Sequence, residues 1–432
     1  MAHLGEFAAV IPTSSCRELN VCLLSRAIVS ANQPTSQLNV MSSSEIVSHA
    51  TEAGPAAAKA SSSSGNRYFV SPLVDFFCLG GGSSILLAAM CLLPLEDHET
   101  AISSLALGLA FVVNYPHFAH SYQMFYKGFA KKAFRSNASR ALRFRYRVAG
   151  IVVPLMLAAF FAIAAYNGNL RMMGYGADLM FLLVGWHYVK QGYGILMVEA
   201  AFKRRFFGER EKKVLLANSY AVWLFSWCAA NDALNERNFA GLKYYMLDVP
   251  DVAIAILGLA AAATTGAALW VFVRKLRTAD SGLPWSGTLA YLASLYAWIL
   301  LVGVHPHGAW FGAWVLLVPT LHSLQYLVVT WRYQLAYEAD GTSGRRLLFP
   351  NLRVRRCHLN MAVFIAAGIL LGFAGFYALP ALLQTLVHYD VQSLGPNMFG
   401  YVTWIFINVH HYFLDNVMWR RENAEVRRHL FS

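Results

Sequence analysis

The chain has 432 residues, of which 57% are hydrophobic and only 13% charged, and its mean hydropathy is +0.43. This composition excludes an ordinary soluble domain and indicates an integral membrane protein. The formal net charge of +12 is accounted for by basic loops and their contact with anionic lipid headgroups, so we expect no nucleic-acid partner.

Residues 1–66 differ in character from the rest of the chain. They are rich in Ser, Ala, Thr and Asn and end near the low-complexity run AAAKASSSSG. Such a composition is typical of a disordered N-terminal tail. The apolar stretch from Val21 to Val29 is short and interrupted by Arg26, so we predict no secretory signal. Met1 and Met41 both remain open as the biological start.

The part from 67 to 420 contains apolar runs that are long enough to cross a bilayer, which takes about 20 helical residues. We place ten of them, at 73–94, 100–124, 147–166, 175–200, 214–230, 249–273, 286–304, 308–331, 358–382 and 396–418. The same composition allows eight to eleven. The predicted fold is therefore all-α and polytopic, followed by a short basic tail at 421–432.

The distribution of cations gives the predicted orientation. Alternate connections and the C-terminal tail hold 27 of the 35 Lys and Arg residues, and the other connections hold Arg171, Arg237 and Lys243. Positively charged residues collect in cytoplasmic loops, and an even number of crossings puts both ends on one side. We predict cytoplasmic termini in a multi-pass protein of a bacterial inner membrane or an equivalent membrane.

Histidine occurs inside four of the apolar runs, NYPHFAHSY, GWHYVKQGYG, PTLHSLQYL and NVHHYFLDNVMW. It is costly in hydrocarbon, and ionisable groups in a membrane span are functional candidates. All four spans run inward in the predicted topology, and a histidine in each of them precedes the first cation after the end of its span by seven to sixteen residues. We therefore expect them to meet at a similar depth in the cytoplasmic half of the membrane.

A metal site explains these histidines economically, because neutral imidazole is a common ligand and HxxH or HxxxD spacing lets one helix give two ligands. The predicted ligands are His117, His120, His187, His322, His411 and Asp415, with His410 as a more distant candidate because it is rotated about 100° from His411. These donors suit one crowded metal or two open ones. Residues expected to orient ligands or oxygen species are Tyr188, Lys190, Gln191 and Gln325.

Other interpretations of the same residues remain open. The His, Lys and Asp side chains also suit a proton- or cation-coupled transporter, and Pro116 and Pro319 would kink two of the spans concerned. Paired histidines suit haem as well. Each histidine alone is typical of a hydrogen bond between helices. His305 and His307 fall in an outer loop, where we interpret them as part of a turn.

The clustered intramembrane histidines resemble those of the histidine-rich integral-membrane non-haem iron oxygenases, namely the fatty-acid desaturase and hydroxylase group and the bacterial carotene dioxygenases. This chain has HFAH at 117–120 and HH at 410–411 where desaturases carry HxxxH and HxxHH boxes. The resemblance implies iron, mononuclear or dinuclear, with zinc as runner-up. It also implies a lipid or other apolar substrate and a reaction that is hydroxylation, desaturation or oxidative cleavage. A separate electron donor is implied unless the protein is a dioxygenase.

Overall fold

Helices account for nearly all of the regular structure in the computed structural model, which describes residues 68–93, 98–135, 138–233, 237–239, 242–244, 247–277, 282–304, 310–343, 350–420 and 422–431. The exception among these residues is an antiparallel ribbon of β1 (Arg237–Phe239) and β2 (Leu242–Tyr244). The predicted all-α class is confirmed apart from this ribbon. The predicted tail 1–66 and the pair His305 and His307 lie outside the described residues.

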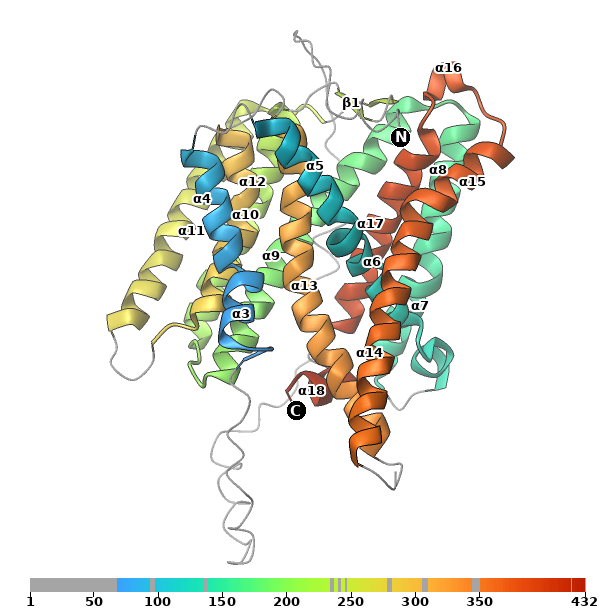
Figure 1. Ribbon diagram of the computed structural model, residues 1–432. Helices are drawn as coiled ribbons and strands as arrows, with labels where there is room; N and C mark the ends of the chain where they lie inside the picture. The colour runs from blue at the N-terminus through green and yellow to red at the C-terminus, as the bar shows by residue number, and fades with distance from the viewer. Residues whose placement is uncertain are drawn as a thin grey trace, which may run out of the picture. The chain divides into compact units, whose positions relative to one another are not determined.

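Within the described ranges, ten helical stretches coincide with the ten predicted segments (Figure 1). Continuous helices form α9 (Leu170–Phe202), α10 (Glu209–Ala233), α11 (Asp251–Arg277), α12 (Trp285–Val304), α13 (Trp310–Ser343) and α17 (Met398–Met418). The other four are composite: α3 (Pro72–Leu79) with α4 (Gly81–Leu92); α5 (Glu99–Leu109), η4 (Ala110–Asn114) and α6 (Tyr115–Tyr126); α7 (Arg140–Arg147), η6 (Val148–Val152) and α8 (Val153–Tyr166); α14 (Pro350–Phe373), η7 (Ala374–Ala378) and α15 (Leu379–Leu386).

Four helices in the described part are long and apolar enough to cross a membrane, namely Thr100–Tyr126, Arg140–Tyr166, Asp251–Arg277 and Arg356–Leu386. The pair α3 and α4, bent by 43°, makes a fifth if it counts as one span. Long helices such as α9, α13 and α17 carry many buried polar side chains, including Asp178, Glu199, Gln325 and Asn408. These polar groups lower the hydropathy of helices that lie inside the bundle.

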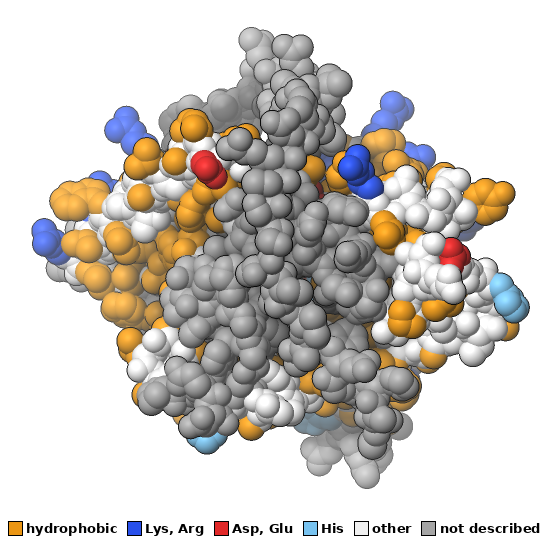
Figure 2. Space-filling view, turned by 90° about the horizontal axis from the view of Figure 1, so that it is seen from above, with side chains coloured by type: hydrophobic (Ala, Val, Ile, Leu, Met, Phe, Trp, Pro, Cys, Tyr) orange, Lys and Arg blue, Asp and Glu red, His pale blue; other side chains and the backbone are white. Residues whose placement is uncertain are grey.

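Apolar side chains face outward on the peripheral helices. Val252, Leu259 and Trp270 of α11 are each more than half exposed, and hydrophobic side chains are prominent around the edge of the view in Figure 2. Exposed apolar area of this extent is expected where lipid replaces water. The helices α9, α13, α17 and α6 occupy the interior (Figure 1), and α9 packs against α10, α12 and α17.

Arg332 of α13 joins the two ends of the described chain. Its guanidinium donates to the carbonyl oxygens of Tyr68 at 2.9 Å, Phe69 at 3.0 Å and Leu430 at 3.1 Å. The residues that precede α3 and the C-terminal helix α18 (Ala424–Leu430) therefore meet at one end of α13. Most of the predicted tail 421–432 is thus helical.

Three of the described π-helical turns, η4, η6 and η7, lie on helices that carry histidines or contact them. In η4, Asn114 immediately precedes α6 and is three residues from His117. In η6, Ala149 offers its carbonyl oxygen to His410. Single π turns inside α-helices are frequent at functional sites, because they redirect side chains and free backbone carbonyls. The third of these turns, η7, continues α14. The remaining short elements described are η5 (Lys131–Arg135) and α16 (Val391–Leu394).

Candidate metal centre

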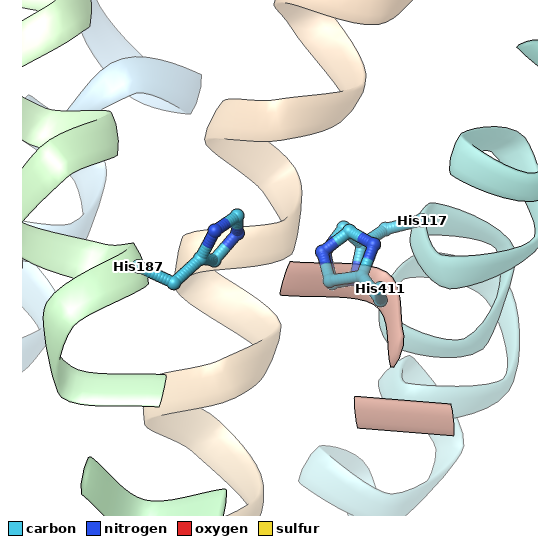
Figure 3. Close-up of side chains that lie close together, drawn as sticks. All are labelled: His117, His187 and His411. Carbon is cyan, nitrogen blue, oxygen red and sulfur yellow. The ribbon is translucent and has the colours of Figure 1, made fainter. Parts of the chain in front are cut away.

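Three histidines from three helices meet in the interior of the bundle. His117 comes from α6, His187 from α9 and His411 from α17, and one ring nitrogen of each lies within 4.8 Å of the others. Figure 3 shows the rings of His117 and His411 close together, with His187 projecting toward them from α9. All three side chains are buried. Segments far apart in the sequence thus deliver imidazole nitrogens to one point.

Hydrogen bonds to Nδ1 of His117 fix the tautomer of its ring, and its Nε2 lies within hydrogen-bond distance of His411 Nε2. Its Nδ1 lies 3.1 Å from the carbonyl oxygen of Asn114 and 2.9 Å from Ser323 Oγ, which itself donates to Asn114 Oδ1. Because a carbonyl oxygen only accepts, this network assigns the ring proton to Nδ1. The Nε2 lone pair then faces His411 Nε2 at 3.0 Å. A metal ligand needs this tautomer.

Asp415 supplies a fourth donor atom, one turn after His411 on α17. Its Oδ1 accepts hydrogen bonds from Ser121 Oγ at 3.0 Å and Tyr326 OH at 2.9 Å. Among the described residues its Oδ2 has no hydrogen-bond partner, and it lies 3.6 Å from His411 Nε2 and 3.8 Å from His187 Nε2. One oxygen is therefore held in place while the other points at the histidines.

Among the described residues, no Lys or Arg forms an ion pair with the Asp415 carboxylate. Asp415 is 3% exposed, and its ion-pair partners in the described part of the chain are His187 and His411. A buried carboxylate is costly unless a proton or a cation neutralises it. Unpartnered buried atoms, here Asp415 Oδ2 and His187 Nε2, call for an explanation such as an ion. A metal ion would satisfy both requirements at once.

The observed separations suit a single ion. Two ligand atoms about 2.1 Å from one metal lie about 3.0 Å apart at a right angle and about 4.2 Å apart across the ion. The separations of 3.0, 3.6 and 3.8 Å fall inside this interval. The 4.8 Å bound on the histidine nitrogens requires an inward shift of at most about 0.6 Å. The residues present therefore fit a metal with nitrogen and oxygen ligands.

His322 lies beside the three histidines without belonging to the group. Its ring stacks on Tyr188 with centroids 3.7 Å apart, and it is 4.9 Å from the His187 ring and 5.7 Å from the His117 ring. Both of its ring nitrogens are buried, and neither has a hydrogen-bond partner in the part of the chain that the structure describes. The predicted ligand His322 is thus adjacent to the group, and its nitrogens are uncommitted.

The structure does not bring His120 and His410 to the group. His120 Nδ1 lies 2.7 Å from Gln123 Oε1, and its Nε2 accepts from Trp331 at 3.3 Å. His410 Nδ1 lies 2.9 Å from Tyr122 OH, and its Nε2 lies 2.9 Å from the Ala149 carbonyl oxygen. Helical rotation points these rings to other neighbours, so all four nitrogens have hydrogen-bond partners.

The residues predicted to orient ligands separate into two sets. Tyr188 is buried against His322, and Gln191 Nε2 donates to the carbonyl oxygen of His322 at 3.0 Å and to Gln325 Oε1 at 3.2 Å. These two glutamines tie α9 to α13. Lys190 is exposed, with its ammonium 5.6 Å from the Trp186 ring centre. No contact between Lys190 and the group is found among the described residues.

Asn114 and Ser323 were not identified from the sequence as residues of the site. Asn114 and Ser323 fix the orientation of His117. Asn114 lies three residues before His117, a spacing that places both on one helix face and was available from the sequence. Ser323 comes from a distant helix, and nothing in its local sequence indicates that it reaches His117.

Comparisons with known proteins give no relative: no family model, no curated protein and no solved structure matches this chain.

Proposed function

We propose that this chain is a multi-pass membrane protein with a metal-dependent oxidoreductase site of the oxygenase, hydroxylase or desaturase type, acting on a lipid or another apolar substrate. One observation carries the proposal: buried, inward-facing donor atoms of His117, His187, His411 and Asp415 converge within bonding reach of one ion. Intramembrane ionisable groups are rare and mark functional sites.

The donor set favours iron, with zinc as the runner-up. Three imidazoles and one carboxylate are the ligand types that suit Fe(II), and a site with positions left open allows it to activate dioxygen. The distances fit one ion, so we favour a mononuclear site over a dinuclear one. Hydroxylation and desaturation with dioxygen consume reducing equivalents, so a separate electron donor is expected unless the protein is a dioxygenase.

The surrounding residues would hold the ligands rather than react themselves. Ser121 and Tyr326 position Asp415 through its Oδ1, and Asn114 and Ser323 hold His117 in the tautomer that exposes Nε2. Hydrogen bonds of this kind set the orientation and basicity of metal ligands. Because the group is buried among apolar helices, an apolar substrate would reach it laterally from the bilayer.

The membrane arrangement that we propose has ten crossings and cytoplasmic ends. Support comes from ten helical stretches of suitable position, from the one-sided distribution of cations and from Arg332, which contacts both ends of the described chain. The histidine group would then lie within the membrane, in a bacterial inner membrane or an equivalent one.

A transporter is the second candidate. The hydrogen-bonded run from Ser121 through Tyr326 to Asp415, with His187 and His411 beyond it, is the kind of chain that can pass protons. The exposed position of Lys190 removes one charge from that path.

The test is an oxygen-incorporation assay on purified protein reconstituted with iron, a chemical reductant and extracted membrane lipids under ¹⁸O₂. Enzymatic oxidation predicts lipid products that carry ¹⁸O or have lost two hydrogens, and it predicts none with His187→Ala. Unchanged lipids, together with histidine-dependent proton uptake in liposomes, would overturn the enzyme and favour the transporter.

A further inference from the structure

A small cavity lies next to His322, on the side of α9 and α13 that faces α4 and α12. Its volume is about 20 Å³, room for about one water-sized group. The apolar part of its wall comes from Leu87, Ala293, Ala297, Val318 and Leu321. The polar part comes from Ser83, Tyr188, Ser294, His322 and Gln325. The cavity therefore adjoins the metal centre without containing its ligands.

Two side chains in the wall have polar atoms that no described residue satisfies. Ser83 is 2% exposed and its hydroxyl has no hydrogen-bond partner, and His322 is 4% exposed with both ring nitrogens unpartnered. Leaving buried donors and acceptors unpaired is unfavourable in free energy. A ligand that pairs with them would recover that free energy.

We propose that this cavity binds the hydroxyl group of an apolar alcohol, which names the substrate class for the metal centre and so rests on the proposed function. A neutral imidazole offers one donor and one acceptor, and a serine hydroxyl offers both. A hydroxyl group can both donate and accept, and so it matches this pair. A hydrocarbon would leave the atoms unpaired, and a carboxylate would be a buried charge without a cation.

The position of α4 favours an apolar molecule over water as the source of that hydroxyl. Ser83 and Leu87 of α4 line the cavity, while Ile85 and Leu92 of the same helix are 56% and 80% exposed. One helix thus separates the cavity from the lipid side. This helix is bent by 43° from α3 beside Gly80, so its path already departs from a straight span. An alcohol could insert its hydroxyl past α4 and leave its chain against the apolar wall.

In this arrangement His322 contacts the substrate and is not a metal ligand. Its ring lies between the cavity and His187, with Tyr188 stacked on one face. A hydroxyl held by His322 would anchor the alcohol at the edge of the metal centre, and the carbon that bears this hydroxyl would be the part of the chain nearest to the oxidising site.

The test is photolabelling of the full chain in lipid nanodiscs with a twelve-carbon alcohol that carries a diazirine next to its hydroxyl end. Crosslinked peptides are mapped by mass spectrometry, and 1-dodecanol, dodecane and dodecanoate serve as competitors. We expect crosslinks on α4, α12 and α13 that dodecanol displaces at least about tenfold more effectively than the other two, as one or two buried hydrogen bonds predict.

Variants separate the cavity from the metal centre. Ser83→Ala and His322→Leu should each weaken labelling about tenfold, His322→Gln should retain most of it, and Ala297→Leu should abolish it by filling the space. Ser219→Ala, a buried serine that bonds to the Leu215 carbonyl oxygen, is the matched control. All of these variants should bind as much metal as wild type, and His411→Ala should still be labelled.

Crosslinks that lie elsewhere, or that dodecanol does not displace, would overturn the inference and leave water as the occupant of the cavity. Loss of metal in both His322 variants would also overturn it. Labelling by the alcohol in a metal-free wild type would support the cavity and contradict the proposed function instead. A wild-type protein that binds metal but is not labelled by the alcohol would contradict the cavity proposal and support the metal centre.

Discussion

Asp415 is the residue on which the electrostatics of the site depend. Its Oδ1 is held by Ser121 and Tyr326, so its Oδ2 has a fixed direction toward His187 and His411. Without a bound cation, the site would need a proton to offset a carboxylate in an apolar interior. The same arrangement that is unfavourable when empty is therefore suited to a metal ion.

Replacing Asp415 with Asn keeps the shape of the side chain and removes its charge. We expect Asp415→Asn to raise the metal dissociation constant at least about 100-fold, beyond the 10- to 100-fold typical of residues that only support a ligand. Metal titration of detergent-solubilised protein measures this. The matched control is Asp178→Asn, a buried aspartate of α9 about 13 Å along the helix from His187. Equal affinities in the two variants would refute a ligand role for Asp415.

Tyr326 acts through Asp415. Tyr326→Phe removes the hydroxyl that donates to Asp415 Oδ1 and lies 2.6 Å from Ser121 Oγ, so we predict metal binding weaker by about tenfold. The control is Tyr401→Phe, which removes an equally buried hydroxyl that donates to the Met173 carbonyl oxygen. The same metal titration compares the two variants. Wild-type metal affinity in Tyr326→Phe would contradict a role for Tyr326 in positioning Asp415.

At the scale of the helices, the site depends on close packing of α6 against α14. A Cβ at Gly372 would lie 2.8 Å from the backbone carbon of Tyr115, two residues before His117, and one at Gly368 would lie 2.3 Å from His120 Cε1. These glycines let α14 approach the segment that positions His117. Small residues at such contacts are typical of helices packed in membranes.

Gly372→Ala should therefore destabilise the fold by about 1–3 kcal/mol, as overpacking does. Gly266→Ala on α11 is the control, because a Cβ there has no neighbour within 4 Å, and it should be neutral or stabilising by up to about 1 kcal/mol. Unfolding in mixed detergent micelles gives both values. Equal stability of the two variants would show that the α6 and α14 contact is looser than described.

Helix positions were predictable because each apolar run is long enough to span a bilayer, as in α9 and α17. The π turns were not, since η4 and η6 have no sequence signal beyond an ordinary apolar helix. The candidate ligands His117, His187, His411 and Asp415, which the structure brings together, were predicted from their presence in apolar runs. His120 was grouped with them because i+3 spacing places residues on one face, but a rotation of about 60° between such positions sends its ring to Gln123 and Trp331.

For the whole molecule, the distribution of charge sets the expected orientation. Ion pairs such as Arg428 with Asp340 and Lys132 with Glu425 connect α18 to α13 and η5 at the end where Arg332 meets Tyr68 and Leu430. Positively charged residues concentrate on the cytoplasmic side of membrane proteins. We therefore expect this end to face the cytoplasm.

Reporter fusions in a bacterial host test that orientation. A fusion after Gly208, in the basic connection between α9 and α10, should be fluorescent with green fluorescent protein and inactive with alkaline phosphatase. A fusion after Gly168, between α8 and α9, should show the opposite pattern. The same pattern at both positions would contradict a crossing by α9.

The central claim is that His117, His187, His411 and Asp415 bind a metal, and the most direct measurement compares His411→Ala with His410→Ala. These neighbours lie on one helix, and both are buried, but the nitrogens of His410 already bond to Tyr122 and Ala149. Plasma mass spectrometry of purified protein should find about one iron per chain in wild type and in His410→Ala, and almost none in His411→Ala. A folded wild type without metal, or equal metal in both variants, would contradict the account.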